Sequence, residues 1–223
     1  MPADYKIIHT RRRSISISIS PDKGVVVRAP YRMPVKTIEK FVSDKEPWIR
    51  KHLNKYSEIT RLNNKKYIDG EDLLYQGKLN RLKVVTTPQS YVNQYDGIIE
   101  AGIGGKESIT KALIDNWYRK RAEGFIYWRF KEILATYSCF GFSPAGLAVK
   151  PLKSRWGSCT SKGKITISSE LIKIDPVFAD YVIIHELCHL KYHNHGKDFY
   201  RLLEELCPDY KSLRKNLSKY ITR

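Results

Sequence analysis

Residues 185–195 have the sequence HELCHLKYHNH and hold four of the chain's six histidines. Within them, His185, Glu186 and His189 form the motif H-E-x-x-H, for which a chain of this composition gives roughly 0.01 matches by chance. On an α-helix, residues four apart lie about 40° apart in azimuth and about 6 Å apart along the axis. Both imidazole rings can therefore bind one ion, with Glu186 beside the open coordination position. This spacing predicts a metal-binding helix in which Glu186 acts as a general base.

The residues before the motif also favour a helix. Asp175-Pro176 is typical of a helix start, with an acidic N-cap and a proline at the first helical position. Residues 181–184 are apolar. An alternative is that His185 and His189 are hydrogen-bonded histidines of the core. Two buried histidines with a glutamate between them are costly to satisfy without a metal, so we favour the metal site.

A catalytic zinc ion usually has three protein ligands and a water molecule, so a third ligand is needed. On a continuing helix, the Cα atom of His193 would lie about 12 Å along the axis from that of His185, too far to share one ion. His195 reaches the ion only if the chain turns between Tyr192 and Gly196, and asparagine and glycine at 194 and 196 suit such a turn. We predict His195 as the third ligand and His193 as a surface histidine or one that supports a ligand.

The interval from His185 to His195 equals that of the metzincin motif H-E-x-x-H-x-x-G-x-x-H. Tyr192 occupies the glycine position of that motif, and no methionine follows, because the only two in the chain are Met1 and Met33. The sequence therefore indicates a zinc hydrolase of another lineage.

The first hundred residues favour strands. Residues 14–20 alternate serine and isoleucine, the pattern of a half-buried strand. Turn chemistry at 21–24 precedes the apolar run 25–27, which indicates a hairpin. Residues 35–56 favour a helix in two pieces. Short strands then follow up to Ala101, separated by three turn pairs: Asp69-Gly70, Gln76-Gly77 and Asp96-Gly97.

The glycine-rich segment 102–105 is the best boundary in the chain. It predicts a β-rich N-terminal region over residues 1–104 and a second domain over residues 105–223. Apolar residues at helical spacing predict a long helix over 108–137. The remaining elements expected in the second domain are strands at 146–150 and 164–168 and a helix at 197–206.

The 223 residues carry a formal net charge of +17, and 42% of them are hydrophobic. That apolar content excludes a mainly disordered chain. No stretch approaches the roughly 20 consecutive apolar residues of a membrane-spanning helix, and the N-terminus lacks the apolar part of a signal peptide. We therefore expect a cytoplasmic protein without a membrane partner. The charge predicts non-specific attraction to polyanions, and the four separated cysteines are expected to be free thiols.

Further segments resemble a known family. They are RWGSC at residues 155–159, the apolar strand at 164–167, DYVIIHELCH at 180–189 and NHGKDF at 194–199. Together these segments resemble the YgjP-like metallopeptidase family, over nearly the whole chain. That family is related in its zinc-site architecture to SprT-type and Wss1-like minigluzincin proteases.

The resemblance implies an α+β fold, in which the β-rich N-terminal half precedes a zincin-like metallohydrolase domain of helices and strands. It implies a zinc ion held by His185, His189 and His195, and it implies Glu186 as the catalytic residue. We therefore predict a zinc-dependent metallohydrolase of the peptidase type that acts on polypeptides.

Two alternatives remain open. The resemblance also implies a nucleoside triphosphate pyrophosphatase, with UTP favoured, that uses the same metal site. Lys153 and Arg155 would suit a polyphosphate if they face the metal, because arginine binds phosphate oxygens bidentately; if they point outward, they are solvated surface charges. The third possibility is a nucleic-acid-binding module with a structural metal. It is disfavoured because closed structural sites generally use four protein ligands.

Overall fold

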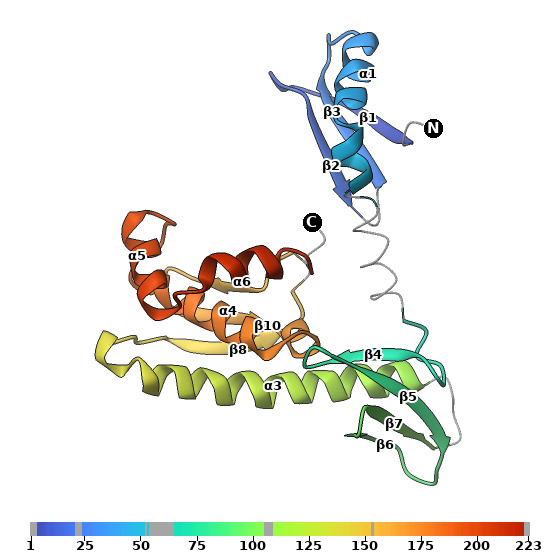
Figure 1. Cartoon of the computed structure of the whole chain (residues 1–223), viewed down its shortest axis with the longest axis vertical. Helices are drawn as coiled ribbons and strands as arrows, with labels where there is room; N and C mark the ends of the chain where they lie inside the picture. The colour runs from blue at the N-terminus through green and yellow to red at the C-terminus, as the bar shows by residue number, and fades with distance from the viewer. Residues whose placement is uncertain are drawn as a thin grey trace. The chain divides into compact units, whose positions relative to one another are not determined.

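The computed structural model describes residues 4–20, 24–51, 53, 65–104, 109–152 and 154–220. The chain divides into two compact units, one made of Met1–Lys65 together with Lys219–Arg223 and one spanning Lys66–Ser218. Both combine helices with small sheets, so the fold is α+β, as predicted (Figure 1). Within the described ranges, no helix has the length and apolar character needed to cross a membrane.

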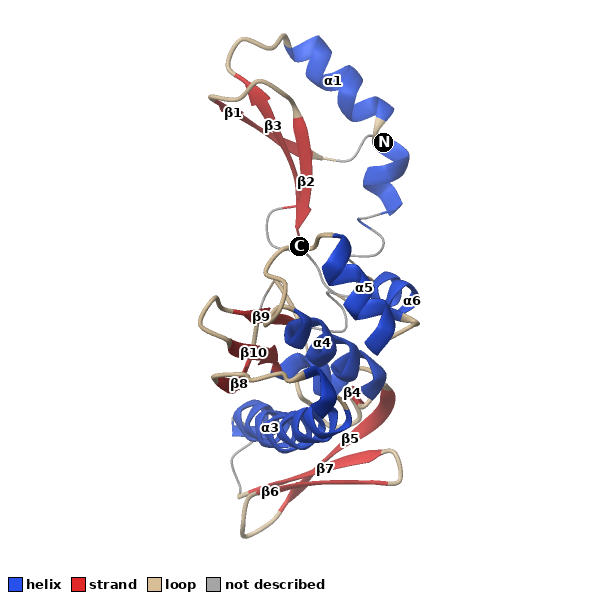
Figure 2. Ribbon diagram, turned by 90° about the vertical axis from the view of Figure 1, so that its left-hand side faces the viewer, coloured by secondary structure: helices blue, strands red, loops and turns tan. Residues whose placement is uncertain are grey.

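The first unit is a three-stranded sheet with a helix on one face (Figure 2). The predicted hairpin is present as antiparallel β2 (Ser16–Ser20) and β3 (Gly24–Pro30), and its turn residues 21–23 lie outside the described residues. The strand β1 (Tyr5–Thr10), which the sequence analysis missed, pairs in parallel with β3.

The predicted helical region of this unit is present in two pieces. The first is α1 (Val35–Asp44), and residues 46–51 are again helical. Residues 54–56 of the prediction lie outside the described residues. Ile38 and Val42 of α1 and Val27 of β3 are buried in one small apolar core.

The second unit begins with a four-stranded sheet of order β4 (Asp72–Tyr75), β5 (Lys78–Thr86), β7 (Ile98–Ile103) and β6 (Tyr91–Tyr95). β5 and β7 are parallel, and the other two pairs are antiparallel. Gln76 and Gly77 have φ angles of 49° and 77°, and Asp96 and Gly97 have 45° and 76°. Positive φ at two successive residues is what a type I′ hairpin turn needs, so two of the three predicted turn pairs form hairpins. The third pair, Asp69-Gly70, forms a turn before β4.

This sheet packs with the helices that follow it. The main-chain N–H of Gln76 donates to the carbonyl of Ile172 at 2.8 Å, and the Tyr118 hydroxyl donates to the carbonyl of Leu74 at 2.6 Å. The boundary predicted after residue 104 therefore falls inside the second unit, which begins at Lys66. Gly102 belongs to β7, where the Tyr91 ring leaves no room for a Cβ atom. That glycine marks close packing and not a linker.

The long helix α3 (Thr110–Thr136) and a second small sheet follow. The sheet has the order β8 (Gly146–Lys150), β10 (Lys164–Ser168) and β9 (Gly157–Cys159). β10 is parallel to β8 and antiparallel to β9, so β9 is an edge strand. The chain ends in α5 (Lys197–Leu206) and α6 (Tyr210–Leu217).

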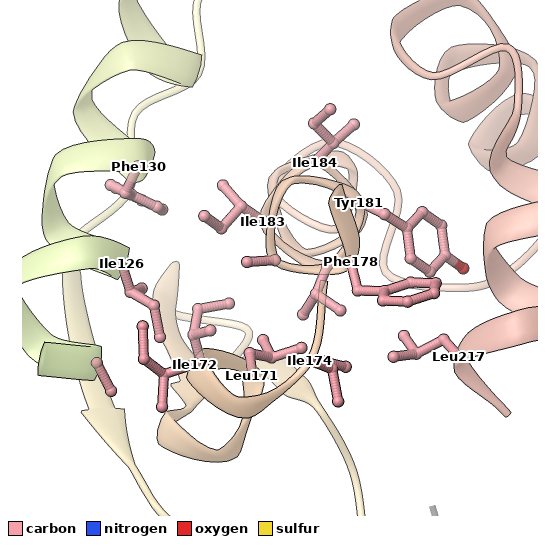
Figure 3. Packing of buried hydrophobic residues seen from close by; sticks show 14 of the residues in the cluster. Ile126, Phe130, Leu171, Ile172, Ile174, Phe178, Tyr181, Ile183, Ile184 and Leu217 are labelled. Carbon is pink, nitrogen blue, oxygen red and sulfur yellow. The ribbon is translucent and has the colours of Figure 1, made fainter. Parts of the chain in front are cut away.

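The core of the second unit surrounds α4 (Pro176–Cys188). Asp175 caps this helix, because its carboxylate accepts a hydrogen bond from the Val177 N–H at 3.0 Å. Apolar residues are buried all round α4, and α3 and the short 3-10 helix η3 (Ser169–Lys173) pack against it (Figure 3). Arg129 of α3 binds Asp180 of α4 through two N–H···O bonds of 2.7 and 2.8 Å. These contacts fix the helix that carries the histidine motif.

Candidate metal centre

α4 places His185 and His189 on the same side of its C-terminal end. The helix ends at Cys188, but His189 keeps helical backbone angles of −68° and −17°, so the four-residue spacing is preserved. The two ring centroids lie 5.0 Å apart. His189 Nδ1 lies 3.0 Å from the carbonyl oxygen of Tyr192. Since a carbonyl only accepts, Nδ1 carries the proton and Nε2 offers its lone pair to a metal.

His195 comes from the loop between α4 and α5. The main-chain N–H of Tyr192 donates to the carbonyl of Cys188 at 3.0 Å, which closes the end of the helix. The chain then turns before Gly196, as the role predicted for His195 requires. This turn brings His195 Nε2 to 3.1 Å from His185 Nε2.

The three histidines fit a zinc ion. One ring nitrogen from each of His185, His189 and His195 lies within 4.8 Å of the other two. Two nitrogens bound to a tetrahedral zinc ion at its usual bond length are about 3.4 Å apart, close to the 3.1 Å between the Nε2 atoms of His185 and His195. Three imidazoles with one side open are also the donor set of a catalytic zinc site.

Burial favours the neutral form of two of the rings, those of His185 and His195. Burial, followed by the charges of the nearby His189, His195 and Arg214, lowers the pKa of His185 to about 3. The pKa of His195 is lowered by burial too, and then by the charges of His189 and Arg214. A metal binds only the neutral imidazole. At neutral pH these two rings can therefore bind a metal without first losing a proton.

Glu186 lies beside the triad with its carboxylate in an apolar setting. Its side chain is 5% exposed, and within the described part of the chain Oε2 has no hydrogen-bond partner. Burial raises the pKa of Glu186 and the positive charge of Arg155 opposes it; together they leave the pKa at about 8. The carboxylate can therefore take up a proton close to neutral pH.

The main chain of β9 passes directly over the Glu186 carboxylate. A Cβ atom on Gly157 would lie 2.5 Å from Oε1 and 2.8 Å from Cγ of Glu186, so only glycine fits at this position. The sequence analysis quoted Gly157 within the RWGSC segment but gave it no role. Its only signal in the sequence is that segment. Gly157 and the carbonyl of Tyr192 are the supporting groups that the motif alone did not reveal.

One aromatic ring lies against all three histidines. Phe199 of α5 is fully buried, and its ring centroid lies 5.0, 4.6 and 4.7 Å from those of His185, His189 and His195. Next to it, the Tyr200 ring lies 6.1 Å from that of His195. The triad is thus held on an apolar support.

The triad opens into a pocket of about 410 Å³, here called the metal pocket. Besides the three histidines and Glu186, its lining residues are Arg155, Gly157, Ser158, Cys159, Ser161 and His193. Arg155, predicted as a substrate-binding residue, therefore lies on the same pocket as the triad. Lys153, predicted for the same role, lies outside the described residues. His193 also lines the pocket and is exposed.

Two further pockets adjoin the metal pocket. One, of about 610 Å³, shares His195 with it and extends over Gly196, Lys197, Tyr200, Arg201, Glu204 and Tyr210. The other, of about 340 Å³, shares Ser161 and His193 with it and extends over Gly141, Phe142, Ser143, Lys162, Gly163, Leu190 and Lys191. We call these the α5 pocket and the Phe142 pocket, and the three together the catalytic groove.

A family model described as "YgjP-like, metallopeptidase domain" matches residues 13–220. No curated protein matches the chain. Among solved structures, the metallopeptidase zymogen abylysin of Pyrococcus abyssi is 25% identical, with a TM-score of 0.34 over 43% of this chain and 90% of its own. The zymogen jannalysin of Methanocaldococcus jannaschii is 24% identical, with a TM-score of 0.35 over 43% of this chain and 97% of its own.

Proposed function

Because the chain belongs to the YgjP-like metallopeptidase family, we propose that it is a zinc-dependent metallopeptidase in which His185, His189 and His195 hold the ion. The observation that carries the proposal is the convergence of these three ring nitrogens beside the buried carboxylate of Glu186. Three imidazoles without a fourth protein ligand leave a coordination position open, which is the catalytic and not the structural pattern. When bound, Zn²⁺ would supply a Lewis acid that polarises the carbonyl to be attacked.

Glu186 then moves the proton. Its Oε2 atom has no competing hydrogen bond in the described structure, and the carboxylate faces the metal pocket. It is placed to accept the proton of the attacking water and to deliver it to the leaving amine. Gly157 holds the carboxylate by close contact with the β9 main chain, so that the base is aligned before substrate binds.

The shape of the site supports a polypeptide substrate. The metal pocket shares His195 with the α5 pocket and shares Ser161 and His193 with the Phe142 pocket, so an extended chain could pass from one pocket to the next across the triad. β9 borders the metal pocket and is an edge strand of its sheet. Its free edge offers main-chain N–H and C=O groups to an extended peptide, which is the usual way in which a sheet edge binds one.

A nucleoside triphosphate is the second candidate. Arg155 lies on the metal pocket, where its guanidinium could bind phosphate oxygens bidentately. Pyrophosphate release from UTP by the zinc-loaded protein, lost on substitution of Lys153 and Arg155, would favour this candidate over the peptidase.

The decisive experiment compares Glu186→Gln with the wild-type protein, both loaded with zinc. We expect zinc content to be unchanged and cleavage of an unfolded polypeptide to fall about 100- to 10,000-fold, the usual contribution of a general base. Glu132→Gln, on the exposed surface of α3, makes the same chemical change away from the groove and should leave cleavage unchanged. Full activity of the Glu186→Gln protein would remove Glu186 from the mechanism.

A further inference from the structure

The Phe142 pocket carries positive charge without a counter-charge. Lys162 and Lys191 line it, and none of its lining residues is acidic. Both side chains are exposed, and neither forms an ion pair within the described part of the chain. Lys191 instead lies over the Phe142 ring, with its Nζ atom 5.7 Å from the ring centroid. The pocket therefore presents two ammonium groups that have no carboxylate partner in the described part of the chain.

In the α5 pocket, the one acidic lining residue is already paired with a lysine. This residue, Glu204, accepts a hydrogen bond from Lys211 at 2.9 Å. Lys197, which lines the same pocket, has no ion pair in the described structure. Beyond it, Arg214 donates to the hydroxyl of Tyr200 at 3.0 Å and has no carboxylate within ion-pair distance in the described structure.

The metal pocket between them adds another cation. Arg155 is exposed there, and the only acidic side chain on its lining is the buried Glu186. All three sections of the catalytic groove thus carry unpaired positive charge, and the negative charges on its walls are either buried or paired. A groove lined by one sign of charge raises the local concentration of ligands of the opposite sign.

We infer that the catalytic groove selects acidic polypeptide segments, with Lys162 and Lys191 binding the carboxylates of residues on one side of the scissile bond. This inference rests on the proposed peptidase function. It names the substrate class.

The aromatic rings of the groove argue against a single-stranded nucleic acid as the occupant. Such ligands bind by stacking bases on open aromatic faces. One face of Phe142 carries Lys191, and Phe140 stacks on the ring at 6.0 Å. Tyr200 and Tyr210 stack on each other at 5.9 Å. The aromatic rings that line the groove are therefore already packed against other side chains of the protein. Carboxylates, in contrast, can bind the exposed ammonium groups directly.

The test uses two peptides that differ only by glutamate or glutamine at the positions flanking the cleaved bond. The zinc-loaded wild-type protein should cleave the glutamate peptide with a kcat/KM about tenfold higher, the combined effect of a few partly exposed ion pairs. The preference should shrink as salt is added, because exposed charges are screened. Equal cleavage of both peptides would overturn the inference and leave the peptidase function standing. Cleavage of neither would overturn both.

Variants assign the preference to the two lysines. In Lys162→Gln/Lys191→Gln the ratio of the two kcat/KM values should approach one, and in Lys162→Glu/Lys191→Glu it should favour a lysine-containing peptide. Lys162→Arg/Lys191→Arg should retain the glutamate preference. The matched control is Lys120→Gln/Lys131→Gln, which removes the same charge from exposed positions of α3 and should retain it as well. Loss of the preference in this control would assign it to net charge and overturn the inference.

A binding measurement separates substrate selection from catalysis. The zinc-loaded Glu186→Gln protein should bind the labelled glutamate peptide about tenfold more tightly than the glutamine peptide, as read by fluorescence anisotropy. Substitution of Lys162 and Lys191 by glutamine should remove that difference. A single-stranded oligothymidine that binds more tightly than the glutamate peptide and displaces it would show that the lysines serve nucleic acid, and would overturn the inference.

Discussion

At the scale of single residues, Gly157 shows how the absence of a side chain leaves room for the Glu186 carboxylate. Gly157→Ala would place a methyl group 2.5 Å from Glu186 Oε1 and force the carboxylate to move. Because a displacement of about 1 Å can cost about 100-fold in rate, we expect kcat to fall roughly 10- to 100-fold with zinc content unchanged. We also expect the free energy of unfolding to fall by about 1–3 kcal/mol from overpacking.

Gly124→Ala is the matched control for this prediction. Gly124 lies within α3, and a Cβ atom there meets no other atom within 4 Å. The substitution should raise the free energy of unfolding by about 0.5–1 kcal/mol through helix propensity, and should leave kcat unchanged. A Gly157→Ala protein with wild-type kcat would show that Glu186 is not held by β9.

The two histidines of the α4–α5 loop should differ in their effect on metal binding. His195 contributes a nitrogen to the triad, whereas His193 only lines the pocket. His195→Ala should weaken zinc affinity by more than the roughly 10- to 100-fold typical of losing a supporting partner. His193→Ala should retain zinc. Competition with a chelator of known affinity measures both. The opposite ranking would make His193 the third ligand.

Sequence reasoning could predict which histidines the structure brings together, because their convergence depends on local geometry. The positions of His185, Glu186 and His189 follow from the four-residue spacing on a helix, and His195 follows from the reach of a short turn. The role of Gly157 could not be found in this way, because its contact with Glu186 depends on how β9 packs across α4.

At the scale of secondary-structure elements, the β6–β7 hairpin carries a cluster around Glu100. The Glu100 carboxylate accepts hydrogen bonds from Lys83, Tyr91 and Tyr95 at 2.9, 2.7 and 2.8 Å. These bonds lower the pKa of Glu100 from 4.5 to about 2. An acid with a lowered pKa in the folded state stabilises the fold above its ordinary pKa. That stabilisation is lost as the pH falls through the lower value.

We therefore expect Glu100→Gln to be less stable than the wild-type protein at neutral pH. The difference between the two proteins should shrink as the pH falls from about 4.5 towards 2, because the wild-type carboxylate becomes protonated over that range. Urea unfolding at a series of pH values measures it. A stability difference that does not change with pH would show that the charge of Glu100 contributes nothing.

Local signals also predicted several elements closely. The Asp175-Pro176 start, the helix at 197–206 and the hairpin after residue 14 are all present. The strand β1 was missed, and so were the parallel pairings of β1 with β3 and of β5 with β7. A parallel pairing joins strands through a crossover, so neither partner carries a local turn signal that would reveal it.

At the scale of the whole molecule, the complete triad and its support lie in one compact unit. The three histidines, Glu186, Gly157 and the main apolar core all belong to Lys66–Ser218. A fragment of residues 66–223 should therefore bind zinc with the affinity of the full chain, and its zinc binding should stabilise it against heat. A fragment that folds, as judged by circular dichroism, but does not bind zinc would show that the first unit completes the site.

The boundary between the units was the part of the organisation that composition could not predict. Glycines at 102 and 104 look like a linker in the sequence, yet Gly102 lies in a strand against Tyr91. The sequence alone does not show whether a glycine is needed for close packing or forms a flexible linker, because only the tertiary structure distinguishes the two.

The buried ring of Phe199 has one more consequence, which concerns how a metal ion and a substrate reach the triad. Its ring packs against all three histidine rings and lines none of the three pockets, whereas the metal pocket is lined by all three histidines. In the described part of the chain, the metal pocket is therefore the route by which a metal ion and a substrate would both reach the triad. A peptide bound across the metal pocket would therefore block the access of a chelator to the metal ion. We therefore expect the protein with bound peptide to lose its metal ion to a chelator more slowly than the protein without peptide.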